Sequence, residues 1–299
     1  MGAGTVGLRE LLELERLDTC LFRGRSRPTA STRVFGGEVA AQALMAAGRT
    51  VPDDRPVHSL HAYFLRPGDP AAPIVYQVDE IRDGGSFTTR RAVAVQHGRP
   101  IFQLSASFHR PEEGYAYQPA PSERPVPEEL PPAEEVIGGA DEGTRQWFAR
   151  VHHALPLEVR FAGELARFAA LRGEPAPPLQ RFWFRTREEL GDDPLLHACA
   201  VVYASDLLLL TTAVAPHGLV LDTSFQFASL DHTLWLHGAP RADDWLFYEQ
   251  EGLWSGSARA LCRGALSDRS GRLVGNVMQE GLIRPLRREE PRSLAESED

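Results

Sequence analysis

The sequence predicts an α+β protein that contains the same unit twice, each unit being an antiparallel sheet wrapped around one central apolar helix. Two helix-like apolar stretches, residues 36–47 and 203–218, are each followed by strand-like segments with hairpin turns. The offset that aligns Ser59 with Ser229 also aligns Gly36 with Asp206, so the order of elements repeats. A chain of 299 residues with 42% hydrophobic content is long enough for two such units.

The first unit is predicted to span residues 1–112. Leucines at helical spacing predict an amphipathic helix at 7–17, which leads into a strand at 18–23 and then the Ala-rich central helix at 36–47. A meander of antiparallel strands is expected to follow, at 57–65, 74–81, 86–96 and 100–109.

Residues 113–155 are rich in proline and lack apolar periodicity, which predicts a linker with room for one short helix at 144–152. The second unit is predicted at 156–286, followed by a charged tail at 287–299. Its expected elements are strands at 157–161 and 180–185, the helix at 203–218, and strands at 225–237, 245–254, 258–266 and 272–283.

Composition excludes several classes of protein. A net charge of −9 argues against a nucleic-acid surface, and all 32 basic residues are arginines, so any cationic contact to a substrate must use Arg. Cys20, Cys199 and Cys262 lack metal-ligand spacing and are expected to be free thiols, with no metal and no cofactor. The absence of an export segment and of an apolar run of membrane length predicts a cytoplasmic protein without a membrane partner.

Asp206 is the most informative single residue. The helix at 203–218 is apolar on every side from residue 207 to 214 and must therefore be buried, and Asp206 lies where its N-cap would be. An ionised carboxylate in an interior is costly unless polar groups meet it. Asp206 is therefore either a simple cap or part of a buried polar site.

Several short motifs resemble those of the type II acyl-CoA thioesterases, a double hotdog family of bacteria and peroxisomes. They occur in the family's order from about residue 8 to 284 and comprise Val34–Glu38, His58–Gly68, Arg82–Gly84, Tyr203–Asp206, Leu230–Trp235 and Val277–Gly281. The resemblance implies a double hotdog fold and hydrolysis of fatty acyl-CoA to a free fatty acid and CoA.

The resemblance also implies a catalytic set. It places Asp206, Ser229 and Gln279 around the attacking water, with Ser229 standing where many relatives have Thr. The helix start at Gly36 and Gly37, or the turn at Asp206, could supply backbone N–H groups to the oxyanion. His58 could support this site, although an ordinary strand histidine is the simpler interpretation.

Two other functions stay open from the sequence. An R-specific enoyl-CoA hydratase, also a double hotdog, would use an Asp and a His five residues apart, and Asp192 with His197 imitates that motif imperfectly. A non-catalytic acyl-CoA binding protein would keep the tunnel without needing three polar groups at a buried helix.

The strand at 225–237 carries apolar residues on both faces, namely Phe225, Phe227 and Trp235 on one and Leu230, Leu234 and Leu236 on the other. A strand buried on both sides needs a second covering layer. We therefore predict a homodimer or homotetramer of chains, each with one active site, because Gly36 stands where the first unit would need an acid.

Overall fold

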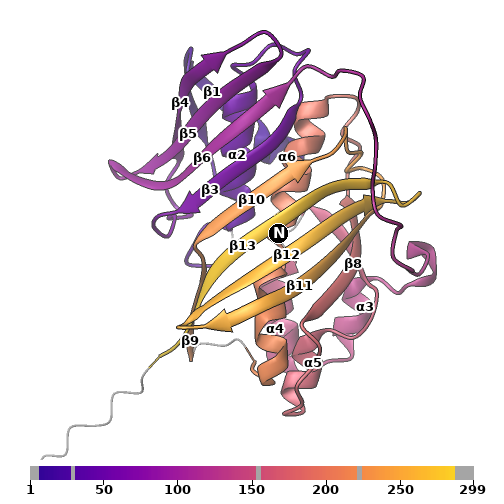
Figure 1. Cartoon of the computed structure of the whole chain (residues 1–299). Coiled ribbons are helices and arrows are strands. Elements are labelled where there is room, and N and C mark those ends of the chain that lie inside the picture. Colours follow the sequence, from indigo (N-terminus) through magenta and orange to yellow (C-terminus); the bar gives the residue numbers. More distant parts are fainter. Residues whose placement is uncertain (1–6, 28–30, 153–155, 221–223, 287–299) are drawn as a thin grey trace, which may run out of the picture.

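The structure is a computed structural model that describes residues 7–27, 31–152, 156–220 and 224–286. One antiparallel sheet of thirteen strands curves around the helices α2 and α6 (Figure 1). Its strand order is β1-β2-β4-β5-β6-β3-β10-β13-β12-β11-β8-β7, with β9 pairing β13 off this path.

The first half of the chain supplies one end of this sheet. Its elements are α1 (Leu8–Leu12), β1 (Glu15–Asp18), β2 (Leu21–Gly24), α2 (Gly36–Gly48), β3 (Val57–Phe64), β4 (Ile74–Asp83), β5 (Phe87–Gln96) and β6 (Arg99–His109). The helix expected at 7–17 is wrong beyond Leu12, since β1 forms a hairpin with β2 through the pair Arg16↔Phe22. The leucine spacing was misleading at Leu14, which is buried like the leucines of α1 but lies outside that helix.

The second half repeats the first. Its elements are β7 (Leu157–Phe161), α5 (Ala166–Leu171), β8 (Leu179–Thr186), α6 (Pro194–Ser205), η2 (Leu209–His217), β9 (Phe225–Ser229), β10 (Asp231–Leu236), β11 (Leu246–Gly256), β12 (Arg259–Asp268) and β13 (Leu273–Pro285). The order β2-β4-β5-β6-β3 of the first half returns as β8-β11-β12-β13-β10. This equivalence confirms the predicted duplication of a helix-and-sheet unit.

The two units meet edge to edge at the centre of the sheet. Strands β3 and β10 pair antiparallel, with Leu60 opposite Leu234 and Tyr63 opposite Asp231. The seam lies in the middle of Figure 1, where the first-half strands give way to the orange and yellow ones. Since inward-facing Leu60 and Leu234 are both buried, one hydrophobic core continues across the seam.

The buried helix of the second half differs from the prediction. It starts earlier, at Pro194, where Asp193 accepts hydrogen bonds from the N–H groups of Leu195 and Leu196. It ends at Ser205, so Asp206 follows the helix as its C-cap instead of opening it. Leu208 then adopts a left-handed conformation with φ of 62°, and the chain continues as the 3₁₀ helix η2.

This correction also changes the length of the apolar helical run. From Pro194 to His217 it has 24 residues, which is long and apolar enough to cross a membrane. Yet 83% of its apolar 18-residue stretch is buried inside the protein. Helix α6 packs against α2, and η2 packs under β11 and β12. The run is therefore the core helix of this fold.

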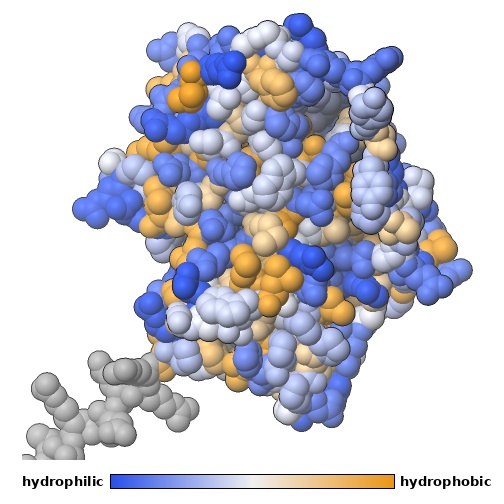
Figure 2. All heavy atoms as spheres, in the orientation of Figure 1, coloured by the Kyte–Doolittle hydropathy of each residue, from blue (hydrophilic) through white to orange (hydrophobic). Residues whose placement is uncertain are grey.

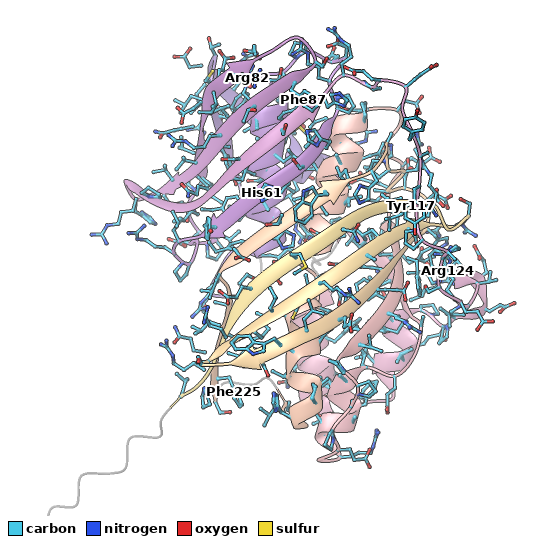
Figure 3. The ribbon with its side chains drawn as sticks, viewed as in Figure 1. His61, Arg82, Phe87, Tyr117, Arg124 and Phe225 are labelled. Atoms are coloured by element: carbon cyan, nitrogen blue, oxygen red, sulfur yellow. The ribbon has the colours of Figure 1, made fainter. Side chains whose placement is uncertain are left out.

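The segment between the halves binds to the second half. It contains η1 (Pro127–Glu129), α3 (Ala133–Gly138) and α4 (Glu142–His152), of which only α4 was expected. Tyr117 and Arg124 lie on this segment at the edge of the second half (Figure 3). Nearby, Gln118 donates to the carbonyl of Gly271, and Trp183 Nε1 donates to the carbonyl of Pro125.

Candidate active site

The carboxylate of Asp206 lies at the junction of the two halves. Its Oδ1 accepts hydrogen bonds from Ser229 Oγ at 3.1 Å and from Gln279 Nε2 at 2.5 Å. Its Oδ2 accepts the backbone N–H of Gly37 at 3.0 Å, at the start of α2. The fold thus brings together the three predicted catalytic residues and one predicted glycine. They come from four places: the end of α6, the end of β9, the middle of β13 and the start of α2.

A buried histidine stands behind this set. Ser205 Oγ donates to the carbonyl of Val202 at 2.8 Å, so it must accept from Nε2–H of His232, 2.7 Å away. His232 Nδ1 is then an acceptor for Gln279 Nε2 at 3.2 Å. Burial lowers the pKa of His232 to about 4, which keeps the ring neutral and fixes this direction of hydrogen bonding.

The sequence did not identify His232 as a member of the site. The available signal was its place in the Leu230–Trp235 motif, directly after Asp231. Alternation along β10 turns His232 to the buried side, and it is 1% exposed. Its contact with Gln279 shows that it positions the amide, which in turn contacts Asp206.

Burial dominates the electrostatics of Asp206. The surrounding protein raises the pKa of this carboxyl to about 6, against the opposing effects of Gln279, Ser229 and the Gly37 N–H, which stabilise the ionised form. A carboxylate with a pKa near 6 is ionised at neutral pH and basic enough to take a proton from water. Such a perturbed group in a cavity is typical of a catalytic base.

The glycines at the start of α2 allow this close approach of the two halves. A Cβ on Gly36 would lie 2.6 Å from Asp206 Oδ2 and 2.9 Å from Phe64, and one on Gly37 would lie 2.3 Å from the carbonyl oxygen of Tyr203. Any side chain here would push α2 away from Asp206. The packing of the two halves therefore requires glycine at both positions, whereas the predicted oxyanion contact of their N–H groups stays a prediction.

Asp206 and Ser229 line a cavity of about 830 Å³ between the halves. Leu207, Leu210 and Phe227 line it from the second half, and Phe35, Phe64 and Phe102 from the first. A cavity of this size, lined mainly by apolar residues, can accept a flexible apolar ligand. Gln279 is fully buried and does not line the cavity, so it contacts Asp206 from behind.

Other sequence candidates lie elsewhere. His58 bonds Ser107 Oγ at 2.8 Å and does not line the cavity. His197 is buried at the start of α6, where it bonds the carbonyl of Gly191 at 2.7 Å, and Asp192 pairs with Arg241 at 2.8 Å. The hydratase-like motif is therefore the turn and first turn of α6, at the opposite end of that helix from Asp206.

Comparison with known families bears directly on this site. The family model described as acyl-CoA thioesterase matches residues 152–282, and that of the acyl-CoA thioesterase N-terminal domain matches residues 25–109. Human acyl-coenzyme A thioesterase 8 is 40% identical over 92% of this chain and 88% of its own length. The chain belongs to the acyl-CoA thioesterase family.

Relatives of this thioesterase include bacterial proteins. Acyl-CoA thioesterase 2 of Haemophilus influenzae is 35% identical over 93% of this chain and 96% of its own. The crystal structure of an acyl-CoA thioesterase II of Mycobacterium marinum is 40% identical, superposes with a TM-score of 0.76, and covers 94% of this chain and 99% of that one. The predicted family is confirmed.

The fold is confirmed by more distant structures as well. A protein with a hot dog fold from Alicyclobacillus acidocaldarius superposes with a TM-score of 0.74 at 17% identity, over 94% of this chain and 98% of its own. The double hotdog architecture predicted from the motifs is therefore the architecture of this chain. The thioesterase hydrolyses acyl-CoA thioesters, which decides against the hydratase and the non-catalytic binder.

Proposed function

We propose that the thioesterase hydrolyses fatty acyl-CoA with a water molecule activated by Asp206 and oriented by Ser229, with Gln279 holding both side chains from behind. The observation that carries this proposal is the shared contact at Asp206 Oδ1. Ser229 and Gln279 both donate to that oxygen, while the carboxyl faces a cavity large enough for an acyl chain.

The proposed reaction has two steps. Asp206 takes a proton from the water as its oxygen attacks the thioester carbonyl, which forms a C–O bond and places the carbonyl electron pair on an oxyanion. The oxyanion then collapses, the C–S bond breaks, and the proton on Asp206 passes to the departing CoA thiolate. The products are a free fatty acid and CoA, with Asp206 ionised again.

We assign the oxyanion donor to the N–H of Gly36. Gly37 N–H already binds Asp206, and the first N–H groups of a helix have no acceptor within it. Gly36 is the first residue of α2 and lines the cavity. An oxyanion there would lie at the positive end of the helix dipole.

A covalent acyl-enzyme is not part of this mechanism. Cys199 and Cys262 are buried, and burial raises the pKa of both thiols, so neither is an activated nucleophile. Cys20 is also free, and the pKa of its thiol is raised. Among the described residues, no group of three His, Cys, Asp or Glu side chains is arranged to hold a metal ion.

Replacement of Ser229 or Gln279 by Ala should lower kcat, and the S229A/Q279A double variant should lose less than the product of the two single effects. The reason is that both side chains act on one carboxylate oxygen, so removal of either already disorders Asp206. Thiol release from a saturated acyl-CoA gives kcat for the wild type, the two single variants and the double variant. Fully independent effects would mean that the two side chains act separately.

Activity should depend on the ionisation of one group near pH 6. The pKa of Asp206 is raised to about 6, and the base must be unprotonated, so kcat/KM should be constant above this pH and fall with unit slope below it. A pH–rate profile between pH 4.5 and 8, with circular dichroism at each pH, would test this. A flat profile in folded enzyme through pH 5 would contradict the assignment.

We further propose that the chain assembles as a homodimer or homotetramer. Within one chain Leu234 and Leu236 enter the core, whereas the outer face of the seam exposes Tyr63 by 56% and Trp235 by 37%. His61 lies on this face near the centre of the sheet (Figure 3), and Figure 2 shows apolar groups scattered among polar ones on the same side of the molecule. Exposed aromatic residues of this kind are typical of contact surfaces.

Light scattering after size exclusion should give a mass of at least two chains at micromolar concentration. A mass near the single-chain value of 33.0 kDa would contradict the assembly. The cytoplasmic location and the absence of nucleic-acid and membrane partners remain predictions from the sequence.

A further inference from the structure

A buried ion pair forms part of the wall of the catalytic cavity. Arg27 and Glu38 are 6% and 3% exposed, and both line the cavity. Arg27 Nε lies 3.7 Å from Glu38 Oε2, and Arg27 Nη2 donates to the hydroxyl of Tyr203. Glu38 directly follows Gly37, and Tyr203 lies one helical turn before Asp206, so the pair is adjacent to the catalytic carboxylate.

This pair is incompletely hydrogen-bonded. Within the described part of the chain, seven buried side-chain polar atoms lack a hydrogen-bond partner, and three of them are Arg27 Nε, Arg27 Nη1 and Glu38 Oε1. A separation of 3.7 Å is too long for a hydrogen bond between the two side chains. Unpaired buried donors and acceptors are destabilising, so two residues of a cavity wall that hold three of them are candidates for contact with a polar ligand.

The two halves of the chain contribute different linings to the cavity. The first half contributes Arg27 and Glu38 and also the exposed arginines Arg33 and Arg66. The lining contributed by the second half is mainly apolar and includes Leu207, Leu210 and Leu282. Asp206 contacts both linings, since it accepts the N–H of Gly37 from the first half and precedes Leu207 in the second.

We propose that Arg27 and Glu38 bind a secondary amide of the pantetheine arm of CoA, while the acyl chain lies against the mainly apolar lining of the second half. This inference rests on the proposed function, because it places the thioester carbon at Asp206. The first amide of the arm is separated from the thioester sulfur by an ethylene spacer and must therefore lie close to the reacting carbon.

The chemistry of the pair fits an amide. A secondary amide offers one carbonyl acceptor for the N–H groups of Arg27 and one N–H donor for Glu38 Oε1. An apolar chain would leave all these atoms unpaired, and a phosphate or carboxylate would be repelled by Glu38. The pair places a donor and an acceptor of opposite charge 3.7 Å apart, which suits a neutral group that both accepts and donates.

The test compares two thioesters of one saturated acyl group. The N-acetylcysteamine ester retains the first amide of the arm, whereas the pentanethiol ester has the same length without it. The double variant R27M/E38L replaces the ion pair by apolar side chains, a change that folded proteins commonly tolerate. The matched control is R160M/E158L, which removes an ion pair at 3.0 Å that does not line the cavity.

The wild-type enzyme should prefer the N-acetylcysteamine ester. In R27M/E38L the ratio of kcat/KM for the two esters should fall by about tenfold or more, the range for losing a hydrogen bond to a charged group. In R160M/E158L the ratio should stay near the wild-type value. If R27M/E38L does not fold, Glu38→Gln preserves the side-chain shape and should still lower the ratio, because the acceptor charge is lost.

An unchanged ratio in a folded R27M/E38L variant would overturn the proposal. The Asp206→Asn variant separates this failure from failure of the proposed mechanism. It should lose activity toward both esters. Activity retained in this variant would contradict the mechanism, whatever the ratio of kcat/KM in R27M/E38L.

Discussion

Replacement of Asp206 by Asn should lower kcat by about 10² or more, which is the general effect of removing a catalytic base. The amide has nearly the shape of the carboxylate but cannot accept the proton of the attacking water. KM should change little, because the cavity lining is preserved. Thiol release at saturating acyl-CoA measures kcat, and the thermal unfolding temperature measures the stability of the variant.

A suitable control for this variant is Asp243→Asn. Asp243 is also mostly buried, accepts the N–H of Leu190 at 3.1 Å, and does not line the cavity. Its variant should keep the wild-type turnover. Wild-type turnover in Asp206→Asn would remove Asp206 from the mechanism, and equal losses in both variants would point to a general structural effect.

Gly36→Ala should lower kcat by roughly 10² without a matching loss of stability. Its Cβ would lie 2.6 Å from Asp206 Oδ2, so the carboxylate must move, and a misplacement of about 1 Å can cost this much in rate. Alanine is favoured over glycine within a helix by about 1 kcal/mol, which offsets part of the strain at the start of α2. Steady-state kinetics and thermal unfolding would separate the two effects.

Gly85→Ala provides the matched control, since a Cβ there would have no neighbour within 4 Å. This variant should resemble the wild type in both rate and stability. If Gly36→Ala retained full activity, the contact between Asp206 and the start of α2 would not be needed for catalysis. Our assignment of the Gly36 N–H to the oxyanion would then also lose its support.

The repeat and the strands were predictable because they leave local signals. Alternating apolar residues and the turn at His97 and Gly98 define hairpins within a few residues, and the structure places both turn residues in the left-handed region, with φ of 49° and 71°. The motifs that carry Asp206, Ser229 and Gln279 were also local. The structure joins the three side chains directly by hydrogen bonds.

The environment of Asp206 was not predictable in the same way. An apolar run has no periodicity to mark a boundary, so the break at Leu208, where α6 gives way to η2, left no signal. Strand 225–237 was expected to be continuous, but it divides at Leu230. Ser229 therefore ends a strand paired with β13 alone, whereas β10 pairs with both β3 and β13.

Local sequence patterns also could not predict the contacts between the two halves of the chain. The Gly37 N–H contacts Asp206 across 169 residues of sequence, and Arg27 contacts Tyr203 across 176. Residue type alone could not show that Arg27 and Glu38 share a cavity with Asp206. Their charges suggested exposed positions, since Arg and Glu are rarely fully buried.

Hydrolysis in water enriched in oxygen-18 tests most directly whether Asp206 acts as a base on water. After many turnovers, the fatty acid should carry the label and the proteolytic peptide that contains Asp206 should carry none, because the carboxylate only transfers a proton. If Asp206 attacked the thioester itself, water would open the resulting anhydride. Oxygen-18 in the Asp206 side chain would contradict the account.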